Sequence, residues 1–549
     1  MNASVRWLSV GRAQGLSPVV SSLLLPLFAV LFCFFPILAG LSQGADGALA
    51  QLGILSDWRA PTLRSLGLIV VAPSLSVLSG FVLGSKLSES NAKCGSWAGI
   101  LLLPVLLGGG VDAFIFKLCV FDFVPLSTLL QDRNSFSFWL SILFMFTWQF
   151  SPCVVFFSWL TCTQVDSSRR VFAVAHGLSF SERLADIYWP QCKNLLAYLF
   201  VLLSAAAASE YERSAVVFRA SQGTDTEFFS HWLLKAYFGA ARIAPSTSAE
   251  TALFYAGLFV LIAILVTVCS GGALAWTAPR AFRLMGKVGS PSGYSAIPSY
   301  LVGLGLVFVL IMPFLPTIRR GLSGLLATRP ESCSMGLWVP AIAASATCII
   351  FSTATRFAWP RVFEGFNRTS LGVSLGVAAG GFLPPIAIAF SGMWWLARLH
   401  QASVPLDQVA VVTWWVLLGV AALPMFFPGY LAMQFAVSTK ELEFLFQHRA
   451  SDSEVFVISF LKRLWPVYLL FSVFLFGFMW TEYPLTALFS GLSNNLCSPA
   501  LDLALRSEGK GTEFNEAASI ILQLAIPIVF CTVGLGSWMN RRERFLRGS

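Results

Sequence analysis

The ionisable residues that interrupt long apolar stretches are the ones whose types and positions could do chemistry in this chain. Asp112 and Lys117 lie five residues apart in one such stretch, and Glu210 and Glu482 each precede a tyrosine near the end of another. If these stretches cross a bilayer, each charge at its centre costs about 3 kcal/mol, so such residues usually line a solute or ion pathway. Alternatively, Asp112 and Lys117 reach the interface at a span end, and the two glutamates cap helices or extend toward headgroups. We treat the four as pathway candidates.

The composition indicates that these stretches do cross a membrane. Apolar residues make up 56% of the 549 residues and charged residues 11%, against roughly 45–50% and 25% in soluble domains. A helix needs about 20 apolar residues to cross the hydrocarbon core, and about twelve such stretches occur here. They predict an all-α polytopic membrane protein with spans at about 18–41, 64–84, 97–120, 137–162, 194–215, 251–276, 300–318, 336–354, 371–396, 409–433, 466–488 and 516–538.

The distribution of basic residues orients the spans. Arg6 and Arg12 precede the first span without an acid, so we expect a cytoplasmic N-terminus. An even number of spans returns the C-terminus to the cytoplasm, and the cytoplasmic segments then hold more Lys and Arg than acids. The net charge of +9 therefore reflects topology and does not indicate nucleic-acid binding, which needs a soluble basic face. The 11 Cys are scattered without a Cys-x-x-Cys pair, and the 4 His fall in loops or at span ends. We expect no catalytic, cofactor-binding or metal-binding set.

The chain contains one pattern twice. "WQFSPCVVF" (148–156) precedes Trp189-Pro190, and "PMFFPGYLA" (424–432) precedes Trp465-Pro466; Pro152 and Pro190 are 38 residues apart, as are Pro428 and Pro466. A Glu-Tyr pair follows each Trp-Pro. We therefore predict two parallel repeats related by an axis along the membrane normal. The first repeat is 1–277, a cytoplasmic connector rich in Gly, Pro and Ser is 278–299, and the second repeat is 300–549.

Each repeat has one cytoplasmic loop far longer than the roughly 2–8 residues that join neighbouring helices, at 164–193 and 434–465. In the first loop, apolar residues recur at spacings of three or four between charged ones, and Gly177 interrupts the pattern. We expect a helix-Gly-helix at the membrane surface, which Pro190 stops before the next span. It either presents a knob to a partner protein or rests on the lipid headgroups.

The segment "AVAHGLSFSERLADIYWP" (173–190) resembles the cytoplasmic loop of ABC importer permeases, whose pattern is Glu-Ala-Ala, three residues, Gly, nine residues, Ile, one residue, a small or apolar residue and Pro. Gly177, Ile187 and Pro190 fall on the Gly, Ile and Pro positions, and Ala173 on the second Ala. The segments "LLLPVLLGGGVDAFIF" (101–116) and "EYERSAVVFR" (210–219) are also similar to parts of that family. Two copies in one chain look like the fused permeases for ferric iron, thiamine or phosphonates.

The resemblance implies the type I ABC importer permease fold and a set of partners. In that family the loop is a coupling helix that docks into a cytoplasmic ATPase, and a periplasmic or lipid-anchored solute-binding protein delivers the solute. The implied partners are therefore two ATPase subunits, which would bind the ATP and Mg, a solute-binding protein and membrane lipid, in a bacterial inner membrane. The residues implied to couple to the ATPases are Ala173, Gly177, Leu178, Phe180, Leu184, Ile187, Pro190, Ser453, Phe456 and Pro466.

The chain departs from the family pattern, most of all in its second half. The positions of Glu and the first Ala hold Val171 and Phe172, and in the second loop Ser453 replaces Gly while Arg463 replaces Ile. We expect two unequal couplings. Two other functions stay open, namely a six-plus-six secondary transporter driven by an ion gradient and a membrane scaffold without transport activity. Neither Gly-Lys pair, at 286–287 or 509–510, has the earlier glycine of a phosphate-binding loop, so we expect no ATPase activity in this chain.

Overall fold

The computed structural model describes a set of helices and the turns that adjoin them. The described residues are 35–36, 38–39, 58–89, 94–107, 109–122, 135–163, 169, 172–173, 175–211, 213–214, 228–234, 248–288, 299–325, 385–401 and 512–548. Within these residues every regular element is a helix and no strand occurs. The prediction of an all-α chain is confirmed for this part of the sequence.

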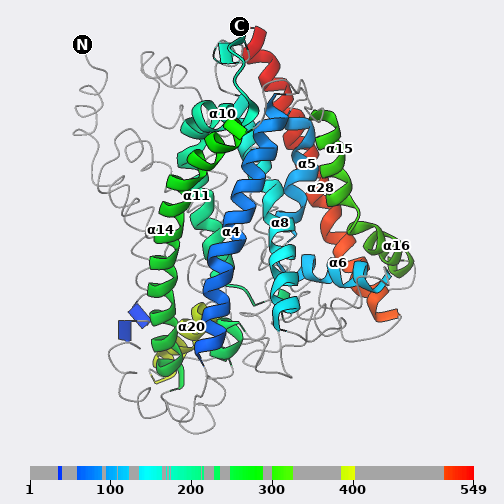
Figure 1. Cartoon of the computed structure of the whole chain (residues 1–549). Coiled ribbons are helices and arrows are strands. Elements are labelled where there is room, and N and C mark those ends of the chain that lie inside the picture. The colour runs from blue at the N-terminus through cyan, green and yellow to red at the C-terminus, as the bar shows by residue number, and fades with distance from the viewer. Residues whose placement is uncertain are drawn as a thin grey trace, which may run out of the picture.

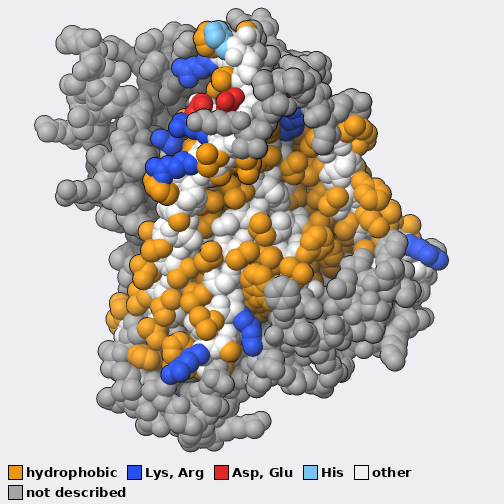
Figure 2. All heavy atoms as spheres, in the orientation of Figure 1, with side chains coloured by type: hydrophobic (Ala, Val, Ile, Leu, Met, Phe, Trp, Pro, Cys, Tyr) orange, Lys and Arg blue, Asp and Glu red, His pale blue; other side chains and the backbone are white. Residues whose placement is uncertain are grey.

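Five helices in the described part are long and apolar enough to cross a membrane. They are α4 (Arg59–Ser88), α8 (Ser135–Thr163), the run that ends in α11 (Trp189–Ala208), α14 (Ser248–Val288) and α28 (Thr512–Gly548). They lie on the predicted spans at 64–84, 137–162, 194–215, 251–276 and 516–538. On the face in Figure 2, hydrophobic side chains cover the middle of these helices, and Lys and Arg lie toward the two ends. The chain therefore has the character of a polytopic membrane protein.

Two further spans are broken rather than straight. The predicted span 97–120 consists of α5 (Cys94–Leu106) and α6 (Gly109–Asp122), whose apolar parts are bent by 109°. The predicted span 300–318 consists of α15 (Ser299–Ile311) and α16 (Phe314–Leu325), bent by 42°. The run of glycines at 108–110 and Pro313 explain the breaks, because glycine lowers helix stability and proline cannot donate the backbone hydrogen bond. Counting each bent pair as one span gives up to seven spans among the described residues.

Small residues set the contact between α4 and α8. A Cβ atom on Gly80 would lie 2.5 Å from Val154 Cβ, and one on Gly84 would lie 2.6 Å from the Val155 carbonyl oxygen. Glycines four residues apart let two helix backbones approach closely. Such close packing is common between membrane helices, because in lipid the hydrophobic effect does not drive helices together. A hydrogen bond of 2.9 Å between the Ser79 and Ser151 hydroxyls adds a polar contact across this interface.

Several helices meet at one end of the bundle. α4 and α14 run toward the end at which α10 (Phe180–Arg183) lies, α11 starts there, and the C-terminal end of α28 lies at the same end (Figure 1). α28 also packs against α5 and α16, so the last helix of the chain contacts the first half. α20 (Pro385–Gln401) packs against α14.

The predicted spans at 336–354, 409–433 and 466–488, and nearly all of 18–41, lie outside the described residues. The twelve-helix count and the two repeats stay predictions.

Candidate functional site

The loop between α8 and α11 forms a compact projection, which we call the surface knob and define as residues 172–173 and 175–188. Gly177 has a backbone φ of 71°, and the Leu178 amide donates a hydrogen bond of 3.0 Å to the Ala173 carbonyl. This hydrogen bond, from an amide to the carbonyl five residues earlier, is typical of the Schellman motif that ends a helix. Gly177 occupies the position of that motif that needs a left-handed backbone. The predicted break at Gly177 is therefore confirmed, and its cause is backbone geometry. Nothing lies within 4 Å of a Cβ at Gly177, so steric crowding plays no part.

A capping box restarts the chain as a helix directly after the turn. The Glu182 amide donates to Ser179 Oγ at 3.3 Å, and the Ser179 amide donates to Glu182 Oε2 at 2.8 Å. Ser followed three residues later by Glu satisfies two otherwise free amides at a helix start. The result is α10, which continues into a single π-helical turn, η2 (Leu184–Tyr188). The residues from Phe180 to Tyr188, which carry the second part of the amphipathic pattern, therefore form a helix.

Pro190 does not stop this helix, contrary to the expectation from the sequence. The chain stays helical from Phe180 to Ala208, and Pro190 is exposed in the first turn of α11. The π-helical turn ends with the Trp189 amide donating to the Leu184 carbonyl, one residue further back than in an α-helix. Such a turn accommodates a proline, which lacks an amide hydrogen, without breaking the helix. The knob is therefore joined rigidly to the spanning helix α11.

Glu89 fixes one side of the knob to the end of α4. Its Oε1 atom accepts hydrogen bonds from Arg183 Nε at 3.0 Å and from the Tyr188 hydroxyl at 3.3 Å. Arg183 Nη2 also lies 3.0 Å from the same oxygen, and Arg183 Nη1 donates 2.7 Å to the Leu178 carbonyl. Arg183 is 14% exposed and Glu89 20%. One arginine thus joins the turn, the helix α10 and the end of α4.

The other side of the knob rests on the end of α14. A Cβ on Gly286 would lie 2.7 Å from Glu182 Cγ and 2.8 Å from Ser179 Oγ, so α14 approaches the capping box directly. An exposed ion pair of 2.7 Å joins Arg283 Nη2 to Asp186 Oδ1. The knob is held between two spanning helices and does not rest on lipid alone. Its exposed tip carries the Phe172 and His176 rings, whose centroids are 3.7 Å apart.

The residues predicted to couple to an ATPase divide into a buried and an exposed group. Ala173 and Leu184 are buried at the base of the knob, and Leu178, Phe180 and Ile187 are half-buried around it. Gly177 and Pro190 are exposed. Ser453, Phe456, Pro466 and the pathway candidate Glu482 lie outside the described residues. The exposed part of the knob is therefore small, and much of the apolar pattern holds the loop against the bundle.

A second site lies within the bundle, where Arg213 gathers polar groups from three elements. We call Asp112, Gln149, Glu210 and Arg213 the charge cluster; all four are buried. Arg213 Nε donates to Asp112 Oδ2 at 3.0 Å, and its two terminal nitrogens donate to Glu210 Oε2 and to Gln149 Oε1. The sequence indicated Asp112, beside Lys117, and Glu210 as separate pathway candidates. The structure brings them together on one guanidinium.

The charge cluster brackets the break between α5 and α6. Asp112 lies in the first turn of α6, where the helix dipole stabilises a negative charge. Gln149 Nε2 donates a hydrogen bond of 3.3 Å to the Pro104 carbonyl near the end of α5. Gln149 therefore connects the end of one half-helix to Arg213, and Asp112 connects the start of the other. The faces of Phe146 and Phe150, 5.2 and 5.7 Å from the guanidinium carbon, complete the enclosure.

The charge cluster holds two carboxyl groups and one guanidinium group. Two carboxylates share one guanidinium, and Oδ1 of the fully buried Asp112 has no hydrogen-bond partner among the described residues. Glu210 Oε1 also accepts a hydrogen bond of 3.0 Å from the Arg213 backbone amide. Glu210 therefore caps the turn after α11 and also pairs with the Arg213 guanidinium. Lys117, the partner considered from the sequence, is half-buried further along α6, while the ion pair of Asp112 is with Arg213. Polar groups held at a helix break inside a bundle are typical of solute and ion sites in transporters.

His231 lies close to the charge cluster. Its ring stacks on Tyr211 with centroids 4.3 Å apart, and its Nδ1 is 3.3 Å from the Ser214 hydroxyl. Burial lowers the pKa of His231 to about 3, so the imidazole is neutral at physiological pH. Arg213, Gln149 and His231 were not among the residues predicted from the sequence. The signal for Arg213 was its position three residues after Glu210, a spacing that pairs side chains on one helical turn.

Among the described residues, no group of three or more His, Cys, Asp or Glu side chains could hold a metal ion. Comparisons with known proteins add no relative, since no family model, no curated protein and no solved structure matches the chain.

Proposed function

We propose that this chain is the membrane permease subunit of an ATP-driven importer, taking a small solute from a binding protein. The observation that carries the proposal is the way the surface knob is held. Its turn, capping box and π-helical turn continue into α11, and Glu89 and Gly286 fix it to the ends of α4 and α14. A partner that pushes the exposed tip would therefore displace three spanning helices together.

The size and chemistry of the tip fit a protein partner. Phe172 is 61% exposed, beside His176 and the Gly177 turn. An exposed aromatic ring on a rigid turn is the kind of group that fills a pocket in another protein, because aromatic side chains dominate binding energy at interfaces. The apolar residues at the base of the knob are already buried against the bundle. They leave little apolar area for insertion into lipid, which favours the partner over the headgroup interpretation.

In this proposal the charge cluster lies on or beside the solute pathway. It joins the broken span α5–α6 to α8 and to the turn after α11, so a movement of α11 changes its geometry. The same observation favours one competing function, a transporter driven by an ion gradient, because such proteins place buried charges at helix breaks. The two functions differ in their energy source, which experiment separates.

The test uses the chain purified from its native membranes together with whatever remains bound. We expect an ATP-hydrolysing subunit to co-purify, and reconstituted vesicles to accumulate the solute retained by the assembly only with ATP inside the compartment that carries the knob. Accumulation with an ion gradient and no ATP would contradict the proposal and favour the competing function. Absence of any nucleotide-hydrolysing partner would contradict it as well.

Two substitutions at Gly177 make the test specific to the knob. Valine is β-branched and strained at positive φ, whereas asparagine tolerates that backbone, so Gly177→Val should destabilise the turn and Gly177→Asn should not. We expect Gly177→Val to uncouple ATP hydrolysis from uptake while the helix content is retained, and Gly177→Asn to remain active. Equal activity of the two variants would remove the coupling role of the knob.

A further inference from the structure

Two spans of the bundle are broken, and α8 donates a hydrogen bond to the end of the first half of each. α5 ends at Leu106, so the carbonyl groups of its last turn have no donor within the helix. The Gln149 carboxamide nitrogen of α8 donates a hydrogen bond of 3.3 Å to one of them, the Pro104 carbonyl. This side chain therefore replaces one of the hydrogen bonds that the break removes.

The end of α15 is completed by the preceding residue of α8. In a continuous helix the Val309 carbonyl would accept a hydrogen bond from the amide of residue 313, but that residue is proline and has no amide hydrogen. The Trp148 indole nitrogen donates a hydrogen bond of 3.1 Å to the Val309 carbonyl instead. Adjacent residues of one helix thus bind backbone carbonyls at two different helix breaks.

The Trp148 ring also contacts both of the half-helices that follow the breaks. Its centroid lies 4.8 Å from that of Phe116 on α6 and 5.6 Å from that of Phe314, the first residue of α16. All three rings are at most 8% exposed. α6 and α16 also pack against each other, and Figure 1 shows both turning away from the directions of α5 and α15. Trp148 therefore joins α6 to α16 as well as binding the end of α15.

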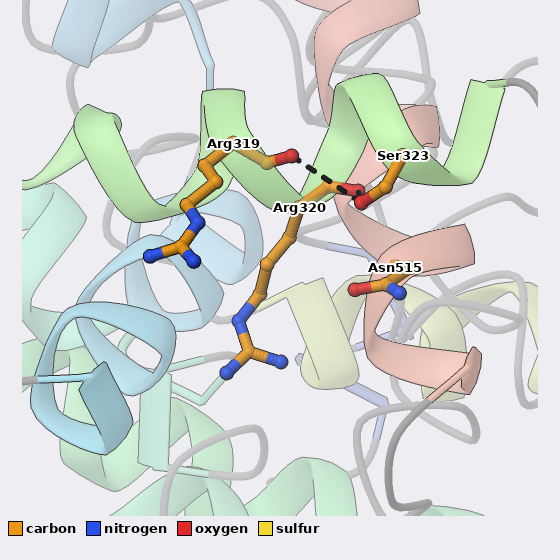
Figure 3. Close-up of a pocket in the computed structure, with 4 residues that line it drawn as sticks. All are labelled: Arg319, Arg320, Ser323 and Asn515. Carbon is orange, nitrogen blue, oxygen red and sulfur yellow. Dashed lines mark hydrogen bonds between the residues drawn. The ribbon is translucent and has the colours of Figure 1, made fainter.

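α16 connects this arrangement to the last helix of the chain. A Cβ on Gly324 would overlap the Asn515 carbonyl oxygen, so α16 and α28 are in close contact at this point. Figure 3 shows Asn515 of α28 beside Arg320 and Ser323 of α16, at a cavity of about 300 Å³ between the two helices. A movement of α16 must therefore carry α28 with it or change this contact.

The turn of α8 that holds both breaks is also a point at which α8 can bend. Pro152 lies inside α8 and removes the helical donor of the Trp148 carbonyl. A proline inside a helix is a common cause of a kink. Gln149 in the same turn also accepts a hydrogen bond from Arg213, so this turn is connected to the chain segment that follows α11.

We propose that Trp148 and Gln149 join the two broken spans into one moving unit, so that α6 and α16 shift together when α8 bends at Pro152. The span α5–α6 lies in the first predicted repeat and α15–α16 in the second, so the unit connects the two repeats. The coupling concerns how the helices are joined and does not depend on the energy source of transport.

Hydrogen exchange of the full chain in micelles, followed peptide by peptide with mass spectrometry, tests the coupling in the variant Trp148→Phe. Phenylalanine keeps an aromatic ring at this position but leaves the Val309 carbonyl without its donor, within a predicted span where water cannot replace it. We expect exchange in 308–325 to become about tenfold faster, because local opening then costs less free energy. If the spans move as one unit, exchange in 109–122 accelerates by a similar factor, while α14 is unchanged.

Trp159→Phe is the matched control. Trp159 is a fully buried tryptophan of the same helix, and its indole nitrogen has no hydrogen-bond partner among the described residues. The control makes the same change of side chain without removing a hydrogen bond, so we expect exchange in 109–122 and 308–325 to change much less. Equal acceleration in the two variants would trace the effect to lost ring volume and would overturn the proposal.

The reverse perturbation starts from the other half-helix. Phe116→Leu, on α6, removes a ring that packs on Trp148, so exchange should accelerate in 314–325 as well as in 109–122. Acceleration confined to the altered span, in this variant or in Trp148→Phe, would show that the two spans open independently and would overturn the proposal. Unchanged exchange in both spans of Trp148→Phe would overturn it as well.

Discussion

Replacing Arg213 by methionine removes the only cation of the charge cluster and leaves Asp112 and Glu210 buried as unpaired carboxylates. Arg213 donates to three acceptors on three elements, and both carboxylates are at most 3% exposed. Removing one partner of a buried pair costs about 3–5 kcal/mol, because the remaining charge keeps its desolvation penalty. Against a total stability of about 5–15 kcal/mol, this loss is large. We expect Arg213→Met to lower the free energy of unfolding by that amount.

Unfolding by denaturant in micelles, followed by helix content, measures this loss, and a rescue experiment identifies its cause. Adding Asp112→Asn and Glu210→Gln to Arg213→Met removes both unpaired charges, so most of the lost stability should return. Arg59→Met, on an exposed arginine, is the control and should change stability by less than about 0.5 kcal/mol. Arg213 does not compensate the buried carboxylates if Arg213→Met behaves like this control, or if the added neutral substitutions make the variant less stable.

Three further predictions concern the knob, the histidine beside the charge cluster and the second loop. Gly286→Val should displace the knob from α14 and abolish ATP-driven uptake, whereas Gly272→Val, on the same helix with nothing within 4 Å of its Cβ, should not; equal uptake would contradict the contact. His231 stays neutral in the fold while the unfolded chain takes up a proton below pH about 6.5, so stability should fall between about pH 6.5 and 3, by roughly 2 kcal/mol at pH 5. The melting temperature of His231→Gln should fall less on acidification than that of the wild type, and parallel pH curves would count against this. Deleting 447–464 should impair uptake less than deleting 171–188, and equal losses would contradict the expected asymmetry.

Hydropathy located the straight spans because their burial in lipid depends on average composition over about 20 residues. The helices α4, α8 and α14 follow from that average alone. The helix breaks at Leu107 and Met312 could not be predicted from hydropathy, because the sequence is apolar on both sides of each break. Only the neighbouring Gly or Pro residues indicate where the helix is interrupted. The sequence also led to the expectation that Pro190 ends a helix. The π-helical turn that accommodates Pro190 depends on the placement of η2 against α4 and α14, which no local rule encodes.

The knob was more predictable than the charge cluster because its signals are local. The Gly177 turn and the Ser179–Glu182 capping box each occupy a few consecutive residues, so their patterns are visible in the sequence. The pair of Arg213 with Asp112 joins residues that are 101 positions apart, and the α5–α6 break brings them together. Candidates such as Asp112 could be named from the cost of burying charge. Their partner could be named only from the fold.

In the proposed function, the exposed tip of the surface knob contacts an ATP-hydrolysing protein. A photo-crosslinking amino acid at position 172, activated in intact membranes, tests this contact directly, and the same amino acid at position 261 on the 60% exposed face of α14 is the control. We predict that position 172 crosslinks to a nucleotide-hydrolysing subunit and position 261 to lipid. Crosslinks from both positions to lipid alone would contradict a contact between the knob and an ATP-hydrolysing subunit.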